Sequence, residues 1–137
     1  MRVPFLILLL AASPAPADDS LTRTQTPMNA AEFDAYVTGK TLTYSQYDYT
    51  FGVEEYLPGR YVAWRPTGED CQYGKWYEKA GLICFTYDYS SAEHCWTFWQ
   101  EGGGLKALAI EDPPDAALSE VAQTADGLHC PAPDVGV

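Results

Sequence analysis

The side chains best suited to chemistry in this sequence are a histidine and a scattered set of carboxylates. His94 stands near the middle of the chain beside Glu93, and His129 lies close to the end beside Cys130. A general base needs an orienting partner and a nearby nucleophile or water, and no serine or cysteine near His94 stands free in a recognisable motif. We therefore expect His94 to be a strand residue with a satisfied ring.

The carboxylates are numerous but carry no catalytic spacing. They are Asp48, Glu54, Glu55, Glu69, Asp70, Asp88, Asp112 and Asp115. Two of them could converge as an acid/base pair or a Ca²⁺ site, yet no loop has the D-x-D-x-D-G pattern of an EF-hand. "EGGG" at 101–104 also lacks the Lys-Ser/Thr of a phosphate loop. We predict no catalytic residue and no cofactor, with a periplasmic hydrolase using carboxylates or His94 as an alternative.

The first residues predict export. "MRVPFLILLLAASPAPA" combines Arg2, an apolar run over 3–12 and an Ala-Pro-Ala cleavage site, which indicates a signal peptide at 1–17. The run is too short for a membrane-spanning helix, which needs about 20 residues. We predict a periplasmic or secreted protein without membrane insertion. A flexible leader is expected at 18–28, a single β domain at 29–130 and a loose tail at 131–137.

The four cysteines support the same compartment. An even number of cysteines in an exported chain indicates two disulfides among Cys71, Cys84, Cys95 and Cys130. Their spacings match no zinc pattern and include no C-x-x-C pair, so we predict no metal site. Three pairings are possible from the sequence alone.

The charge of the chain limits its partners. Asp and Glu number 19 against 8 Lys and Arg, for a formal net charge of −11. Such a charge argues against nucleic acid and anionic lipid surfaces as partners. We expect a monomer with an unknown small ligand or protein partner. An inhibitor-like or structural protein that engages a basic partner is a further alternative.

The sequence pattern predicts one helix followed by an antiparallel meander. In "NAAEFDAYVTG", Asn29 and Glu32 form a capping box, Phe33 lies on the apolar face, and Gly39 ends the helix. β-Branched and aromatic runs then alternate with turn residues. We expect strands near 41–47, 51–57, 60–65, 72–78, 82–88, 93–100 and 104–110, and one helical turn in "DPPDAALSEVAQ". The fold class is mainly β: a curled sheet or small barrel with one N-terminal helix and two disulfides.

The stretch at 74–99 is expected to form the core. If Cys84 lies opposite Cys95, then Ile83 faces Trp96 and Phe85 faces His94, with a two-residue turn at 89–90. This register places the aromatic residues on one face, which Val62, Trp64, Trp76 and Phe98 can join. It also favours the pairs Cys84–Cys95 and Cys71–Cys130.

The opposite face offers a candidate binding surface. Tyr61, Tyr73, Tyr77 and Trp99 have the other parity, as does Tyr56 if a two-residue type II turn at "LPGR" keeps register. Exposed together, these rings would form a platform for a small ligand or a partner protein. A non-enzymatic binding module that uses this face or a barrel mouth is the leading hypothesis.

Several motifs are shared with a known group. "AAEFDAYVTGKTLTY", "VEEYLPGRYVAW", "GKWYEKAGLICFTYD" and "HCWTFW" resemble small exported bacterial proteins of unknown function. The resemblance covers roughly residues 29–110 and rests on Gly74, Trp76, Cys84, Cys95 and Trp96. It implies a single exported β domain with a helix in front, and no activity or catalytic residue.

Overall fold

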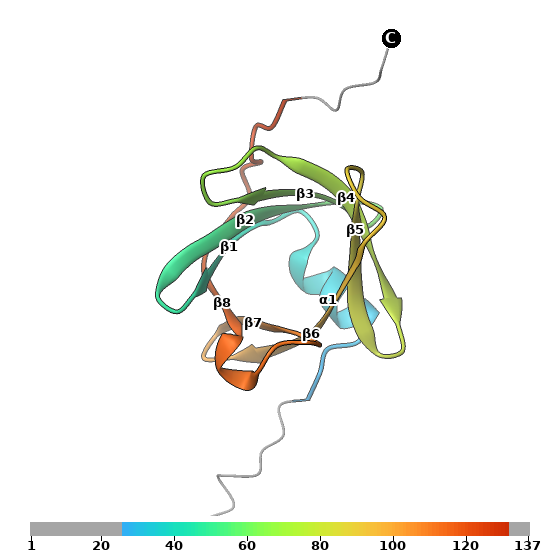
Figure 1. The fold of residues 1–137 in the computed structure, drawn as a ribbon, viewed down its shortest axis with the longest axis vertical. Helices are drawn as coiled ribbons and strands as arrows, with labels where there is room; N and C mark the ends of the chain where they lie inside the picture. Colours follow the sequence, from blue (N-terminus) through green and yellow to red (C-terminus); the bar gives the residue numbers. More distant parts are fainter. Residues whose placement is uncertain (1–25, 132–137) are drawn as a thin grey trace, which may run out of the picture.

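The chain folds into a closed antiparallel barrel of eight strands in chain order (Figure 1). A computed structural model describes residues 26–131. The expected signal peptide, most of the leader and the tail from residue 132 lie outside the described residues. The predicted fold class is confirmed, and the sheet is a barrel rather than an open curl. The elements are α1 (Ala30–Val37), β1 (Thr41–Gln46), β2 (Tyr49–Leu57), β3 (Tyr61–Pro66), β4 (Gln72–Lys79), β5 (Leu82–Tyr87), β6 (Glu93–Glu101), β7 (Gly104–Ala109), η2 (Pro114–Ala116) and β8 (Leu118–Thr124).

Helix α1 begins and ends where the sequence indicates. The Asn29 side chain accepts a hydrogen bond from the Glu32 backbone, and the Glu32 carboxylate accepts one from the Asn29 backbone, both at 2.9 Å. These bonds satisfy two of the free N–H groups at the helix start. At the other end Gly39 adopts a φ of +84°, which releases the chain toward β1.

The helix closes one end of the barrel, and Figure 1 shows α1 inside the ring of strands. Phe33 has no exposed surface and contacts the rings of Trp76, Tyr56, Phe85 and Phe98, with centroids 4.4 to 6.4 Å apart. These contacts make Phe33 the centre of the apolar core. We call this end the closed end. The loops at 47–48, 67–71, 88–92 and 110–117 lie at the opposite end, the open end.

The β2–β3 hairpin differs from the sequence prediction, and the difference changes which side chains of β2 point into the barrel. Gly59 adopts the expected positive φ of +80°, but Arg60 is also left-handed at +66° and extends the loop. Leu57 therefore pairs with Tyr61, and Tyr56 pairs with Val62. Because paired residues share a face, Tyr56 points into the barrel and is buried. Its predicted place on the outer face is wrong.

The hairpin of β5 and β6 has the predicted register. Cys84 lies opposite Cys95, Ile83 opposite Trp96 and Phe85 opposite His94. The pairing stops at Thr86, however, so the connection spans 88–92 rather than two residues. The Asp88 N–H bonds the Tyr73 carbonyl on β4 instead of continuing the β6 ladder. Both predicted disulfides are present, Cys84–Cys95 and Cys71–Cys130.

Strand β8 closes the barrel and was not expected from the sequence. The predicted helical turn is confirmed as the short 3₁₀ segment η2, and the strand follows it directly. β8 pairs with β7 for two residues and with β1 over most of its length. No helix within residues 26–131 is long and apolar enough to cross a membrane.

Candidate functional site

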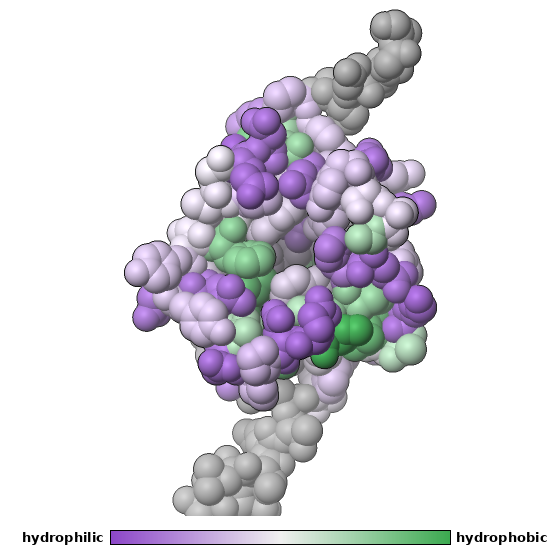
Figure 2. Space-filling model, viewed as in Figure 1, coloured by the Kyte–Doolittle hydropathy of each residue, from purple (hydrophilic) through white to green (hydrophobic). Residues whose placement is uncertain are grey.

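A cavity of about 200 Å³ opens at the open end of the barrel. Figure 2 views the barrel from the direction of Figure 1, and a hollow lies near the middle of the face it shows. All eight strands contribute to the lining. The lining residues are Tyr44, Phe51, Glu54, Trp64, Gln72, Phe85, Tyr87, Tyr89, His94, Trp96, Phe98, Ala107 and Leu118.

The aromatic walls of the cavity continue the rows of inward-facing side chains that form the core. Residues of β5 and β6 that point inward near the closed end form the core, and their neighbours two positions along line the cavity. Phe85 and Phe98 belong to both, since their rings touch Phe33 on one side and border the cavity on the other. They separate the filled half of the barrel from the hollow half.

The mouth of the cavity is bordered by exposed rings. Tyr89, on the β5–β6 loop, is 63% exposed, and Phe51, at the start of β2, is 37% exposed. Phe51 lies against Trp64 at 5.6 Å between centroids. A Cβ atom at Gly52 would collide with the Trp64 indole, so the glycine leaves space for this ring. The cavity is therefore reached from solvent between aromatic side chains.

Glu54 is the one carboxylate of the lining, and it is only 5% exposed. Its Oε1 atom accepts a hydrogen bond from the Tyr87 hydroxyl at 3.0 Å, and Oε2 accepts one from the Tyr56 hydroxyl at 3.2 Å. Tyr56 shares a further bond of 2.8 Å with Tyr44. Two buried tyrosines, Tyr44 on β1 and Tyr56 on β2, and the partly buried Tyr87 on β5 thus form a connected polar network with the carboxylate.

Burial changes the ionisation of this network. Loss of solvation raises the pKa of Glu54 from 4.5 to about 7, against the opposing effect of the hydrogen bonds from Tyr87 and Tyr56. Burial also raises the pKa of Tyr44, Tyr56 and Tyr87 well above 10. The three tyrosines therefore stay neutral hydroxyl donors near neutral pH. In the same pH range the Glu54 carboxyl changes from its protonated to its ionised form.

The buried carboxyl predicts an unusual dependence of stability on pH. The folded pKa of Glu54 is about 7 and the unfolded one 4.5, so only the folded chain binds the proton between these values. The free energy of unfolding should then fall as pH rises from about 4.5 to about 7, by about 3 kcal/mol from this group, and stay constant above.

Urea unfolding at pH 5 and pH 8 checks this expectation. Glu54→Gln carries no titrating group there, so it should be more stable than the natural chain at pH 8 and similar to it at pH 5. Parallel stability profiles of the two proteins would contradict the ionisation change at Glu54.

His94 lies in the same cavity, with its ring 6.2 Å from that of Tyr87. Among the described residues that line the cavity there is no Ser, Thr, Cys or Lys to act as a nucleophile. The groups of the lining that are suited to acid–base chemistry are Glu54 and His94. A catalytic role of His94 stays an untested alternative.

The four residues predicted as a binding face lie on the outside of the barrel. Tyr61 on β3 is 59% exposed, and Tyr73 on β4 borders an acidic depression with Glu69 and Asp70. Trp99 on β6 is partly buried. Among the described ring contacts, none joins two of the four. Their role as a binding surface stays a prediction.

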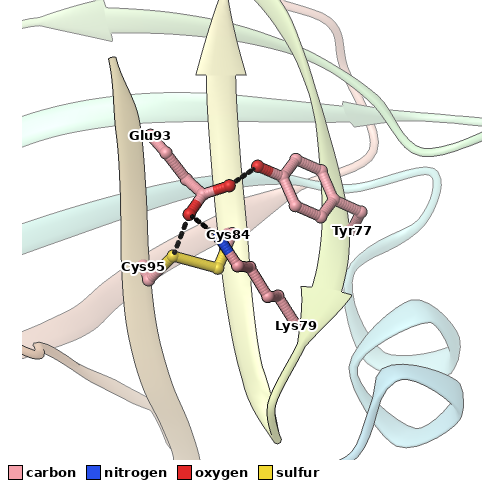
Figure 3. The surroundings of a disulfide bond; sticks show 5 residues. All are labelled: Tyr77, Lys79, Cys84, Glu93 and Cys95. Atoms are coloured by element: carbon pink, nitrogen blue, oxygen red, sulfur yellow. Dashed lines mark hydrogen bonds and ion pairs between the residues drawn. A yellow bond between two sulfur atoms is a disulfide. The ribbon is translucent and has the colours of Figure 1, made fainter.

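Tyr77, the fourth, covers a disulfide. Figure 3 shows its hydroxyl directed at Glu93, which also pairs with Lys79 at 2.8 Å, over the sulfur atoms of Cys84 and Cys95. Glu93 and the two cysteines are close enough to suggest a metal site. Both sulfur atoms are bonded to each other in the disulfide, so they are not thiolates that could bind a metal. The group is a disulfide with Glu93, Tyr77 and Lys79 beside it.

The sequence analysis named a barrel mouth as one possible binding place, but it did not single out Glu54. Glu54 is one of the eight carboxylates without a catalytic spacing, and only the true register of the β2–β3 hairpin turns it inward. The signal that could have found it is the alternation of Gly52, Glu54 and Tyr56 on one face, once Arg60 is counted in the loop.

The fold and this cavity define a small antiparallel β-barrel that is closed by a helix at one end and hollow at the other. No protein-family model matches the sequence, and neither the curated proteins nor the solved structures include a match.

Proposed function

We propose that this protein is an exported binding barrel that holds one small molecule in the cavity at its open end. The observation that carries the proposal is the hollow half of the barrel, with aromatic walls and one buried charged group. An eight-stranded barrel is wide enough either to be filled by its own side chains or to hold a small ligand. Here the closed half is filled and the open half is not.

The size of the cavity limits the ligand. An apolar cavity of about 150 Å³ is enough for benzene, so about 200 Å³ admits one ring with a short substituent. Drug-sized ligands occupy pockets of roughly 300 to 1,000 Å³ and would not fit without movement of the mouth. A few polar groups among apolar walls are also what small-molecule sites have in common.

Export is part of the same proposal. The signal-peptide pattern at 1–17 and the disulfides Cys71–Cys130 and Cys84–Cys95 are both typical of proteins that work outside the cytosol. The resemblance to small exported bacterial β-domain proteins agrees with this placement. A binding protein in the periplasm or outside the cell would meet its ligand as a free solute.

A variant that fills the cavity tests the binding proposal. Ala107 lines the cavity and is buried between its partners Phe98 and Leu118. Ala107→Leu should place an isobutyl group in the hollow, reduce the affinity for 2-phenylethanol and related one-ring probes at least tenfold, and change stability by less than about 1 kcal/mol. Calorimetry and ligand-observed NMR measure the binding.

The matched control places the same side chain outside. Ala122 is exposed on β8, and Ala122→Leu should bind the probes like the natural chain. If Ala107→Leu and Ala122→Leu bind equally well, the cavity is not the binding site. If no one-ring probe, whether neutral, cationic or anionic, binds the natural chain, the binding function itself is wrong.

A hydrolase is the second candidate, because Glu54 and His94 line one cavity. In that case His94→Ala should lower turnover of small esters or amides steeply, with the fold unchanged by circular dichroism. A rate equal to that of the natural chain would exclude this role of His94.

A further inference from the structure

Above its pKa of about 7, Glu54 is a buried anion without a cation to balance it among the described residues. Within residues 26–131 it forms no ion pair, and its partners are the hydroxyls of Tyr56 and Tyr87. A carboxylate that leaves water pays a desolvation penalty that neutral hydroxyl donors offset only in part. A positive group brought to the carboxylate would offset more of it, and the cavity is the place from which such a group can arrive.

The surroundings of the carboxylate suit an ammonium group with an apolar body. Tyr44, Phe51, Trp64 and Trp96 place aromatic rings around the same space. Aromatic faces attract cations through their quadrupole, most strongly where water is excluded, and the same rings accept an apolar chain or ring. The chain as a whole carries a net charge of −11, which favours the approach of a cation and opposes that of an anion.

We propose that the ligand of the cavity is a small amine, a primary ammonium group joined to one aromatic ring or a short alkyl chain, and that the ammonium pairs with Glu54. This inference rests on the proposed binding function and names its ligand class. It assigns Glu54 the role of the charge-recognising residue and the aromatic walls that of the apolar subsite. The buried carboxyl is retained at a cost in stability because the ligand needs it.

Three probes of one shape test the charge of the ligand. Calorimetry at pH 8 compares 2-phenylethylamine, 2-phenylethanol and phenylacetate on the natural chain and on Glu54→Gln. The amine should bind the natural chain at least about tenfold more tightly than the alcohol, with phenylacetate weakest. In Glu54→Gln the preference for the amine should vanish while the affinity for the alcohol stays within about twofold. Both the preference for the amine and the affinity for the alcohol are compared with those of the natural chain.

The outcomes separate this inference from the function on which it rests. If the alcohol binds, is blocked by Ala107→Leu, and the amine binds no better, the ligand class is wrong and the binding function stands. If Glu54→Gln keeps the preference for the amine, the role of Glu54 is wrong. If none of the three probes binds the natural chain, both proposals fall.

Proton release from the natural chain provides a test that needs no variant at Glu54. Pairing with the ammonium favours the ionised carboxylate, so binding of 2-phenylethylamine at pH 7 should release a fraction of a proton. Calorimetry in buffers of different ionisation enthalpy measures this fraction, which should be near zero for 2-phenylethanol. Equal release by the two probes would overturn the pairing.

The groups that face Glu54 define the control for this experiment. Tyr44 on β1, Tyr56 on β2 and Tyr87 on β5 keep their protons at pH 7 because burial raises their pKa. His94 on β6 is a further titratable group that lines the same cavity. The release should therefore persist in His94→Gln, and its disappearance there would assign the proton to His94 and overturn the inference.

Discussion

Replacing Phe33 with alanine is expected to lower the free energy of unfolding by about 4 kcal/mol. The Phe33 side chain has no exposed surface and is the only residue of α1 whose ring touches four other rings of the barrel interior. Its loss would leave a cavity at the closed end, in addition to the lost transfer energy and the edge-to-face ring contacts. Urea unfolding followed by circular dichroism measures the change.

The same substitution at Phe51 is the matched control. Phe51 is 37% exposed at the mouth of the open end, so Phe51→Ala should cost about 1 kcal/mol or less. A loss of similar size in Phe33→Ala and Phe51→Ala would show that α1 is not an essential part of the core. The barrel would then be stable with its closed end open to water.

The parts of the fold that follow from local chemistry could be predicted from the sequence. The capping box of α1 needs only Asn29 and Glu32, and the register of β5 and β6 follows from the requirement that Cys84 reach Cys95. Each of these pairs lies close together in the sequence, so few arrangements compete. The second disulfide then followed by elimination.

The orientation of β2 could not be predicted because it depends on one residue of a loop. With two residues between β2 and β3, Tyr56 would face outward beside Tyr61, and Glu54 would face outward with it. Arg60 adopts a left-handed conformation that non-glycine residues seldom have, and this single step turns Glu54 into the cavity. Glu54 was missed as a residue of the site for the same reason that Tyr56 was misplaced.

Strand β8 was missed because its partner is distant and its own pattern is weak. Four of its seven residues, 121–124, are exposed, so the alternation that marks a half-buried strand is absent from half of its length. Its pairing with β1 joins residues such as Thr41 and Thr124, which lie at opposite ends of the domain. Barrel closure is a property of the whole sheet rather than of this segment.

Removal of the Cys71–Cys130 disulfide is expected to have the other large effect. The bond joins residues 59 apart in sequence, and the chain-entropy model assigns such a loop about 4 kcal/mol, against about 3 kcal/mol for the 11-residue separation of Cys84 and Cys95. The double variant Cys71→Ser/Cys130→Ser should therefore be the less stable of the two disulfide-free proteins. Urea unfolding of both double variants measures the order.

Loss of the two disulfides should also increase local opening in different parts of the barrel. Leu128 is buried, and its N–H donates to the Glu55 carboxylate at 3.0 Å, which holds the segment before Cys130 against β2. Without the Cys71–Cys130 bond, amide exchange at Leu128 should accelerate far more than exchange in β5 and β6. The Cys84→Ser/Cys95→Ser variant should leave Leu128 protected. If Leu128 stays protected in both variants, the Glu55 contact, and not the disulfide, fixes the segment to the barrel.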